Sequence, residues 1–228
     1  MSGPTAVKSP RVRRKRAGSF HHGDLAEQLA LAAAELVERK GYHAFTMKEL
    51  AARLGVSDAA IYRHYASRDA LLAEVGVRGF LRFIAAIEAA LQGVDDPFES
   101  VARYGRAYVR FAVGNPGWFR LQFSRTAAEG LRQIPGVMER FAPAEAARLR
   151  LLQLWRAALP PGDDRVADLY RLVWGTVHGL AGFVVERVFQ LVQTDEERIA
   201  AADVAIDLLV ASLRARAAQP VADADVAR

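Results

Sequence analysis

The residues best suited to binding chemistry are concentrated in one short segment, VSDAAIYRHYASRDALL, at positions 56–72. It contains two tyrosines, a histidine, two arginines and two serines, and it follows Gly55 directly. Hydroxyl, imidazole and guanidinium groups donate hydrogen bonds to phosphate oxygens and to base edges. A cluster of this kind therefore raises the question of whether the segment contacts a nucleic acid.

The composition describes a chain that can build a large core without covalent crosslinks. It has 228 residues, 52% of them hydrophobic, and no cysteine, which excludes disulfide scaffolds, thiolate enzymes and cysteine-ligated zinc. The longest charge-free apolar window, residues 172–185, is shorter than the ~20 residues that cross a bilayer. With no apolar secretion signal at the start, we expect a soluble protein in the cytoplasm, with no membrane partner.

The net excess of positive charge lies in the first third of the chain. Residues 1–70 carry twelve Lys or Arg against seven Asp or Glu, and the remaining residues carry nineteen of each. This asymmetry favours an N-terminal part that faces a polyanion, although a basic tail that only aids solubility would give the same count. The run RVRRKR within residues 1–19 has no acidic neighbour and predicts a disordered basic arm.

Four helices are predicted around the polar segment. Apolar spacing indicates a helix from Asp24 to the KGY sequence at 40–42, and Thr46 stands three residues before Glu49, as in a capping box that opens a second helix. Gly55 ends that helix. Serines at 57 and 67 suit the N-caps of a short helix over 58 to about 64 and of a long one over 68 to about 91.

Two short helices joined by the tight LGVS corner at 54–57 predict a helix-turn-helix, whose second helix enters the DNA major groove. In this register Val56 and Ile61 point inward and the small alanines face outward, close to base edges. An ordinary helical corner with solvated polar tips is the alternative. The residues we expect to contact DNA are Thr46, Lys48, Ser57, Asp58, Ala59, Ala60, Tyr62, Arg63, His64 and Arg68.

The segment from about Phe20 to Val75, above all TMKELAARLGVSDAAIYRHYASRDALL, closely resembles the N-terminal domain of the tetracycline-repressor (TetR) family of transcriptional regulators. The resemblance implies an all-helical homodimer with a three-helix DNA-binding domain and a helical ligand-binding domain. This chain departs from common family residues at Ala59, Tyr65 and Arg68. The departures at Ala59 and Arg68 affect the operator sequence that the resemblance would predict, but not the expected mode of DNA binding.

The rest of the chain is predicted to be helical, with no strand pattern. Asp96 and Asn115 precede prolines at the first helical position, PPGDD at 160–164 separates a helix over 148–159 from the next, and TDEE at 194–197 opens the last helix. The fold class is therefore all-α. We expect an arm at 1–19, a DNA-binding domain at 20–66, a ligand-binding and dimerisation domain at 67–217, and a disordered tail at 218–228.

The predicted helix over 165–191 is apolar nearly all round in its middle. One stripe comprises Val166, Tyr170, Val173, Val177, Leu180, Val184, Val188 and Leu191. A helix buried on two sides suits one face toward its own domain and one toward a partner, so we expect a homodimer through the last two helices. A central helix in a monomeric bundle would give the same pattern.

The segment WGTVHGLAGF at 174–183 resembles the Trp-His-Gly signature of one class of TetR C-terminal domain, and NPGWFRLQF at 115–123 resembles its companion segment. That resemblance implies a pocket for a small, mostly apolar or aromatic inducer between the helices over 68–91 and 165–191. Aromatic residues commonly line such cavities. The candidates are Tyr104, Tyr108, Phe111, Trp118, Phe119, Phe123, Trp155, Trp174 and His178.

Catalytic and metal-binding patterns are missing from the sequence. The adjacent histidines at 21 and 22 have no carboxylate set at ligand spacing, and neither a phosphate-binding glycine loop nor a nucleophile elbow is found. We therefore expect no enzyme, metal or cofactor, and hypothesise a ligand-released repressor of a palindromic operator. A helical protein-binding adaptor and a small-molecule enzyme or carrier remain as alternatives.

Overall fold

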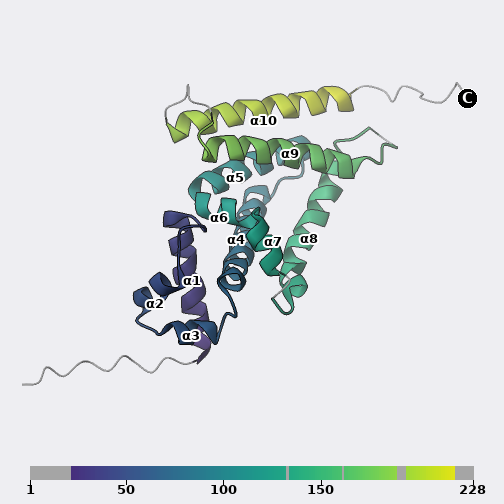
Figure 1. Ribbon diagram of the computed structural model, residues 1–228. Helices are drawn as coiled ribbons and strands as arrows, with labels where there is room; N and C mark the ends of the chain where they lie inside the picture. The colour runs from purple at the N-terminus through teal and green to yellow at the C-terminus, as the bar shows by residue number, and fades with distance from the viewer. Residues whose placement is uncertain (1–21, 132–133, 161, 189–193, 219–228) are drawn as a thin grey trace, which may run out of the picture.

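The computed structural model describes residues 22–131, 134–160, 162–188 and 194–218, and within them it contains ten α-helices and no strand. The helices are α1 His22–Lys40, α2 Met47–Leu54, α3 Asp58–Tyr62, α4 Arg68–Leu91, α5 Pro97–Gly114, α6 Pro116–Gln122, α7 Arg125–Leu131, α8 Val137–Arg156, α9 Val166–Val185 and α10 Asp195–Ala217. In Figure 1, α1–α3 lie at one end, α9 and α10 lie side by side at the other, and α4 connects the two ends. None of the described helices is long and apolar enough to span a membrane.

Hydroxyl side chains cap the N-termini of α2, α3 and α4, as the sequence predicts. The hydroxyls of Thr46, Ser57 and Ser67 accept hydrogen bonds from the backbone amides three residues later, at 3.1, 3.2 and 3.0 Å. Gly55 ends α2 with a φ of 67°, a left-handed conformation that glycine adopts without steric cost. The helix-turn-helix geometry is therefore set by local hydrogen bonds.

The first core packs α1, α2, α3 and the start of α4 together. Leu29, Leu36, Leu50, Ile61 and Leu71 are fully buried within it. Because its first two turns belong to this core, α4 is part of the N-terminal domain, while its later turns pack against the bundle.

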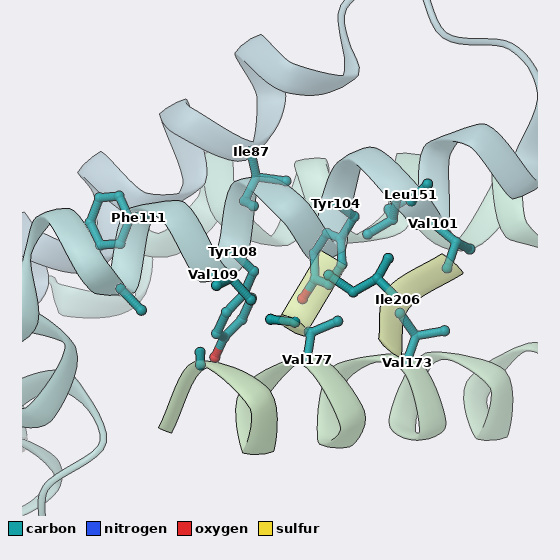
Figure 2. Packing of buried hydrophobic residues seen from close by; sticks show 14 of the residues in the cluster. Ile87, Val101, Tyr104, Tyr108, Val109, Phe111, Leu151, Val173, Val177 and Ile206 are labelled. Carbon is teal, nitrogen blue, oxygen red and sulfur yellow. The ribbon is translucent and has the colours of Figure 1, made fainter. Parts of the chain in front are cut away.

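The second core lies between α5, α8, α9 and α10. Figure 2 shows Tyr104 and Tyr108 of α5 close to Val177 of α9, with Ile206 of α10 beside them. Gly105 allows this approach, since a Cβ there would lie 3.1 Å from side-chain atoms of both Ile206 and Val177. The four helices are packed too closely for a larger residue at 105 without movement.

Where the two cores meet, two glycines are packed so closely that a larger residue would not fit at either position. A Cβ on Gly117 of α6 would lie 2.5 Å from the Val37 carbonyl oxygen of α1, and a Cβ on Gly130 of α7 would lie 2.6 Å from the Ala73 Cβ of α4. The Glu38 carboxylate also accepts hydrogen bonds from the amides at the start of α6, at 3.3 and 3.2 Å. Helices α6 and α7 thus fix the N-terminal domain to the bundle.

Some element boundaries differ from the sequence prediction. Helix α8 starts at Val137 rather than 148 and contains Pro143, and α7 was not predicted. Asn115 does not cap α6, because its side-chain amide instead donates to the Phe111 carbonyl oxygen. Helix α9 ends at Val185, so Val188 is exposed rather than part of the buried stripe. The predicted arm, the residues after 218 and Leu191 lie outside the described residues.

Candidate nucleic-acid interface and ligand pocket

The outer surface of the helix-turn-helix corner is formed by four residues of α3 and its C-terminal end. Asp58, Ala59 and Arg63 are exposed, and Tyr62 is 51% exposed. Our prediction placed Ala60 on the outer face, but it is buried with Ile61 in the N-terminal core. Its methyl group is therefore turned away from the surface that could meet base edges.

Polar residues around α3 extend this surface. Thr46, Lys48 and Ser57 are exposed, and His64 is half-buried. The Thr46 and Ser57 hydroxyl oxygens accept the cap hydrogen bonds, which leaves each O–H group able to donate outward. The arrangement offers several neutral donors and two cations at the edge of one short helix.

Arg68 has a structural role that the sequence did not reveal. Its Nε donates to the Phe45 carbonyl oxygen at 3.1 Å, its Nη2 donates to the Tyr42 carbonyl oxygen, and its guanidinium lies 5.0 Å from the centre of the Phe45 ring. These contacts hold the loop between α1 and α2 against the start of α4. These hydrogen bonds use the Nε and Nη2 atoms, and a phosphate contact of Arg68 stays a prediction.

A cavity of about 450 Å³ lies between α4, α5, α8 and α9, close to the place predicted for the ligand. It is lined by Phe80, Phe83, Ile84, Ile87, Glu88, Leu91, Val94, Tyr104, Phe123, Ala147, Arg148, Arg150, Leu151, Leu154, Tyr170 and Trp174. The walls are mainly apolar, with charged residues on α4 and α8 among them. This volume is within the ~300–1,000 Å³ typical of small-molecule sites.

Only three of the nine aromatic candidates line this cavity, namely Tyr104, Phe123 and Trp174. The others have packing roles: Tyr108, Phe111, Phe119 and Trp155 are buried in the bundle core, Trp118 packs against Gly79 of α4, and His178 bonds to Tyr108. Aromatic residues on the inner faces of α5 and α9 serve the core equally well, so residue type did not separate the two roles.

The pocket was predicted beside α4, but none of its lining residues on α4 was named, and the contribution of α8 was not predicted. Phe80, Ile84 and Ile87 follow one another at helical spacing along α4, and Leu151 and Leu154 face them from α8. The available signal was the apolar face of α4 beyond Val75, which extends past what a three-helix domain needs to bury.

Buried hydroxyls sit beside the cavity. Burial, together with the neighbouring Tyr170 and Tyr108, raises the pKa of Tyr104 well above its ordinary value. The Tyr108 hydroxyl lies 2.8 Å from His178 Nδ1, and burial lowers the pKa of His178. Tyr104 and Tyr108 are therefore neutral at pH 7, and their hydroxyls supply hydrogen-bonding groups without charge.

Helices α9 and α10 share an exposed apolar surface. Leu172, Phe183, Val204 and Leu208 are 45–65% exposed, and a Cβ at Gly175 would meet nothing within 4 Å. Four large exposed apolar side chains on two adjacent helices form a surface suited to covering by another protein surface.

Two family models match the chain in these two regions. Residues 29–75 match the bacterial regulatory proteins of the tetR family, and residues 101–206 match the tetracyclin repressor-like C-terminal domain. The chain belongs to the TetR family. The matched regions coincide with the helix-turn-helix domain and with the bundle that holds the cavity. The finer resemblance to the Trp-His-Gly class stays a prediction.

Individual relatives agree with this membership. The chain is 28% identical over 116 residues to the HTH-type transcriptional activator FasR of Mycolicibacterium smegmatis, covering 51% of this chain and 53% of FasR. It spans about half the length of the curated relatives it matches.

Solved structures share the fold over most of both chains. A TetR-family transcriptional regulator from Pectobacterium atrosepticum matches with a TM-score of 0.62 at 23% identity, over 84% of this chain and 95% of that one. The TetR-family regulator PfmR from Thermus thermophilus matches with a TM-score of 0.55 at 25% identity, over 80% and 94%. The all-helical, two-part architecture is thus that of TetR-family proteins.

Proposed function

We propose that this TetR-family chain is a DNA-binding transcriptional regulator, which recognises an inverted-repeat operator as a homodimer and responds to a small, mostly apolar ligand. One observation carries the proposal: α4 belongs to both functional regions. Leu71, Leu72 and Val75 pack in the core beneath the helix-turn-helix, and Phe80 to Leu91 line the cavity. A ligand that favours one position of α4 would shift operator affinity by its differential affinity for the two positions.

On the DNA side, we assign base-edge contacts to the exposed face of α3, at Ala59 and Arg63, and a phosphate contact to Tyr62. Thr46, Lys48, Ser57 and His64 would contact phosphates and fix the register. Ala60 is reassigned to a supporting role because it is buried, and Arg68 has a supporting role in addition to its predicted phosphate contact. Residues 8–16 would add salt-dependent phosphate contacts.

The exposed apolar surface of α9 and α10 supports a homodimer. Two copies that pair these helices would bury the surface in a four-helix interface, with the same patch on both subunits. This pairing would carry two copies of α3 to successive major grooves, about one helical turn apart.

On the ligand side, we propose a repressor that its ligand releases from the operator. The volume of the cavity and its mainly apolar lining favour an uncharged or weakly polar ligand, with the Tyr104 and Tyr170 hydroxyls as hydrogen-bond partners. FasR is named an activator, so a promoter fusion measured with and without the chain decides the sign of regulation here. The same proposal gives the chain no catalytic role and places it in the cytoplasm with its operator.

The test is selection of bound duplexes from a randomised pool, followed by a salt titration of the enriched sequence. We expect an inverted repeat and a steep salt dependence. Tyr62→Ala should weaken binding roughly tenfold on every operator variant, and Leu31→Ala, at a residue on α1 with equal exposure, should not.

Two results would contradict the proposal. A folded dimer that enriches no sequence would favour the protein-binding adaptor. A chain that binds or converts a small molecule without any effect on DNA binding would favour the carrier or enzyme.

A further inference from the structure

The cavity between α4, α5, α8 and α9 extends along α4. The α4 residues that line it recur at every helical turn from Phe80 to Leu91, a distance of about 16 Å along the axis at ~1.5 Å per residue. A volume of about 450 Å³ spread over that length is roughly 6 Å across. Because packed carbon atoms lie about 3.5–4.0 Å apart, this width accepts one hydrocarbon chain but not two side by side. The shape therefore favours a long, narrow ligand.

Charged side chains lie at the opening of this apolar space. In the part of the chain that the structure describes, the charged residues lining the cavity are Glu88, Arg148 and Arg150. Arg150 of α8 donates to the Glu88 carboxylate of α4, and the two side chains are 61% and 43% exposed. Side chains that line the cavity and also reach solvent lie where the cavity opens. This ion pair therefore bridges α4 and α8 across the opening.

The ion pair between Glu88 and Arg150 can be exchanged at little cost. An exposed arginine–carboxylate pair contributes little to stability, because water solvates both partners. Arg148 is held more firmly, since two of its nitrogens donate to the Glu145 carboxylate of the same helix. A guanidinium binds a carboxylate through two parallel hydrogen bonds. A ligand carboxylate at the opening could therefore replace Glu88 on Arg150.

Resting on the regulator function proposed above, we propose that the cavity binds an unbranched aliphatic monocarboxylate, with its chain along α4 and its carboxylate on Arg150 in place of Glu88. The helix from Glu88 back to Phe80 is about 12 Å long at ~1.5 Å per residue, which about ten bonds of an extended chain span at ~1.2 Å each. The charge of the ligand stays at the exposed opening, so the apolar walls contact only its uncharged chain.

The test compares decanoate with decanol, which has the same chain without the charge, by tryptophan fluorescence of the full-length chain at neutral pH. Trp174 lines the cavity, so a ligand that fills it changes the surroundings of an indole. Glu88→Gln removes the competing carboxylate and should raise the ratio of decanoate to decanol affinity about fivefold. Arg150→Gln should lower that ratio about fivefold, and Arg150→Lys, which keeps the charge, should restore part of it.

Two controls separate this site from general effects of charge and chain length. Glu99→Gln and Arg103→Gln break a similarly exposed ion pair on α5, away from the residues that line the cavity, and should leave the ratio unchanged. In the wild type, affinity should rise about fourfold for each CH₂ group added from hexanoate to decanoate, and then level off as the chain fills the space back to Phe80.

Three results would each overturn the inference. They are a ratio that does not change in Glu88→Gln or in Arg150→Gln, an equal change in the α5 controls, and the absence of saturable, chain-length-dependent binding of decanoate. Because the titration uses no DNA, such a failure leaves operator binding untouched, and failure to find an operator leaves the titration result untouched.

Discussion

Glu74 of α4 joins three helices through a buried ionic network, and replacing it tests how firmly the two domains are connected. Its side chain is 10% exposed. The carboxylate accepts from Arg78 Nε at 2.7 Å and from Arg140 of α8 at 2.5 and 3.1 Å. Arg78 in turn donates twice to Glu27 of α1, at 2.7 Å each.

Glu74→Gln keeps the shape and removes the charge that two arginines share. Breaking a fully buried ion pair costs about 3–5 kcal/mol. The side chains of Arg78 and Arg140 remain 28% and 34% exposed, so water compensates part of the loss, and we expect about 2–3 kcal/mol. At about 2–4 °C per kcal/mol for a chain of this size, the melting temperature should fall by roughly 4–12 °C.

The pH dependence provides a second readout. Burial by itself would raise the pKa of Glu74, but hydrogen bonds and charge from Arg140 and Arg78 outweigh it and hold the pKa below its ordinary value of 4.5. A carboxylate with a lowered folded pKa stabilises the protein above its unfolded pKa, and this contribution is lost as the pH falls through the folded pKa. The difference between wild type and Glu74→Gln should therefore be full at neutral pH and vanish in acid.

Urea unfolding followed by circular dichroism measures both effects. Glu129→Gln is the matched control, because Glu129 pairs with Arg125 on an exposed surface and its loss should cost less than about 0.5 kcal/mol. A loss at Glu74 no larger than at Glu129, or a difference that persists unchanged in acid, would refute the view that the network is a buried connection between domains.

Three further substitutions test other contacts. Gly117→Ala should destabilise the chain by more than about 2 kcal/mol in urea unfolding, because its Cβ would fall 2.5 Å from an α1 carbonyl oxygen; an unchanged midpoint would contradict this close packing. Leu208→Glu, at a residue 65% exposed on α10, should convert the proposed dimer to monomer in analytical ultracentrifugation and leave the monomer folded, and a persistent dimer would place the interface elsewhere. Arg68→Lys should lower stability by about 1–2 kcal/mol without changing the preferred operator, since the single ammonium nitrogen of Lys does not reproduce the spaced Nε and Nη2 donors that bind the Phe45 and Tyr42 carbonyl oxygens; an altered operator preference would return Arg68 to the DNA surface.

The helix starts and the buried stripes could be predicted from the sequence. Thr46, Ser57, Asp96 and Thr194 each accept a hydrogen bond from the amide three residues later, so one short segment contains the whole signal. In α10 the apolar residues that recur at helical spacing are buried or half-buried, as that spacing predicts: Ile199, Ala202, Ile206, Leu209, Val210 and Leu213. Local hydrogen bonds and helical periodicity need no knowledge of the partner helices.

The less periodic segments were predicted poorly. Helix α7 has seven residues, including a glycine, and the first turns of α8 contain Pro143, so neither carries a strong local signal. Packing of α7 against α4, with Gly130 in direct contact with Ala73, stabilises what propensity does not.

By itself the sequence determined an all-helical chain, a helix-turn-helix corner, and membership of a family that the matches to residues 29–75 and 101–206 establish. Only the tertiary structure decided which aromatics line the cavity, that Ala60 is buried, and that Arg68 binds backbone carbonyl oxygens. The physical reason is the separation along the chain between the residues that interact. A cap or a stripe depends on neighbours a few residues away, whereas a cavity wall or a buried guanidinium depends on groups brought together from distant helices, whose fit no spacing within one helix encodes.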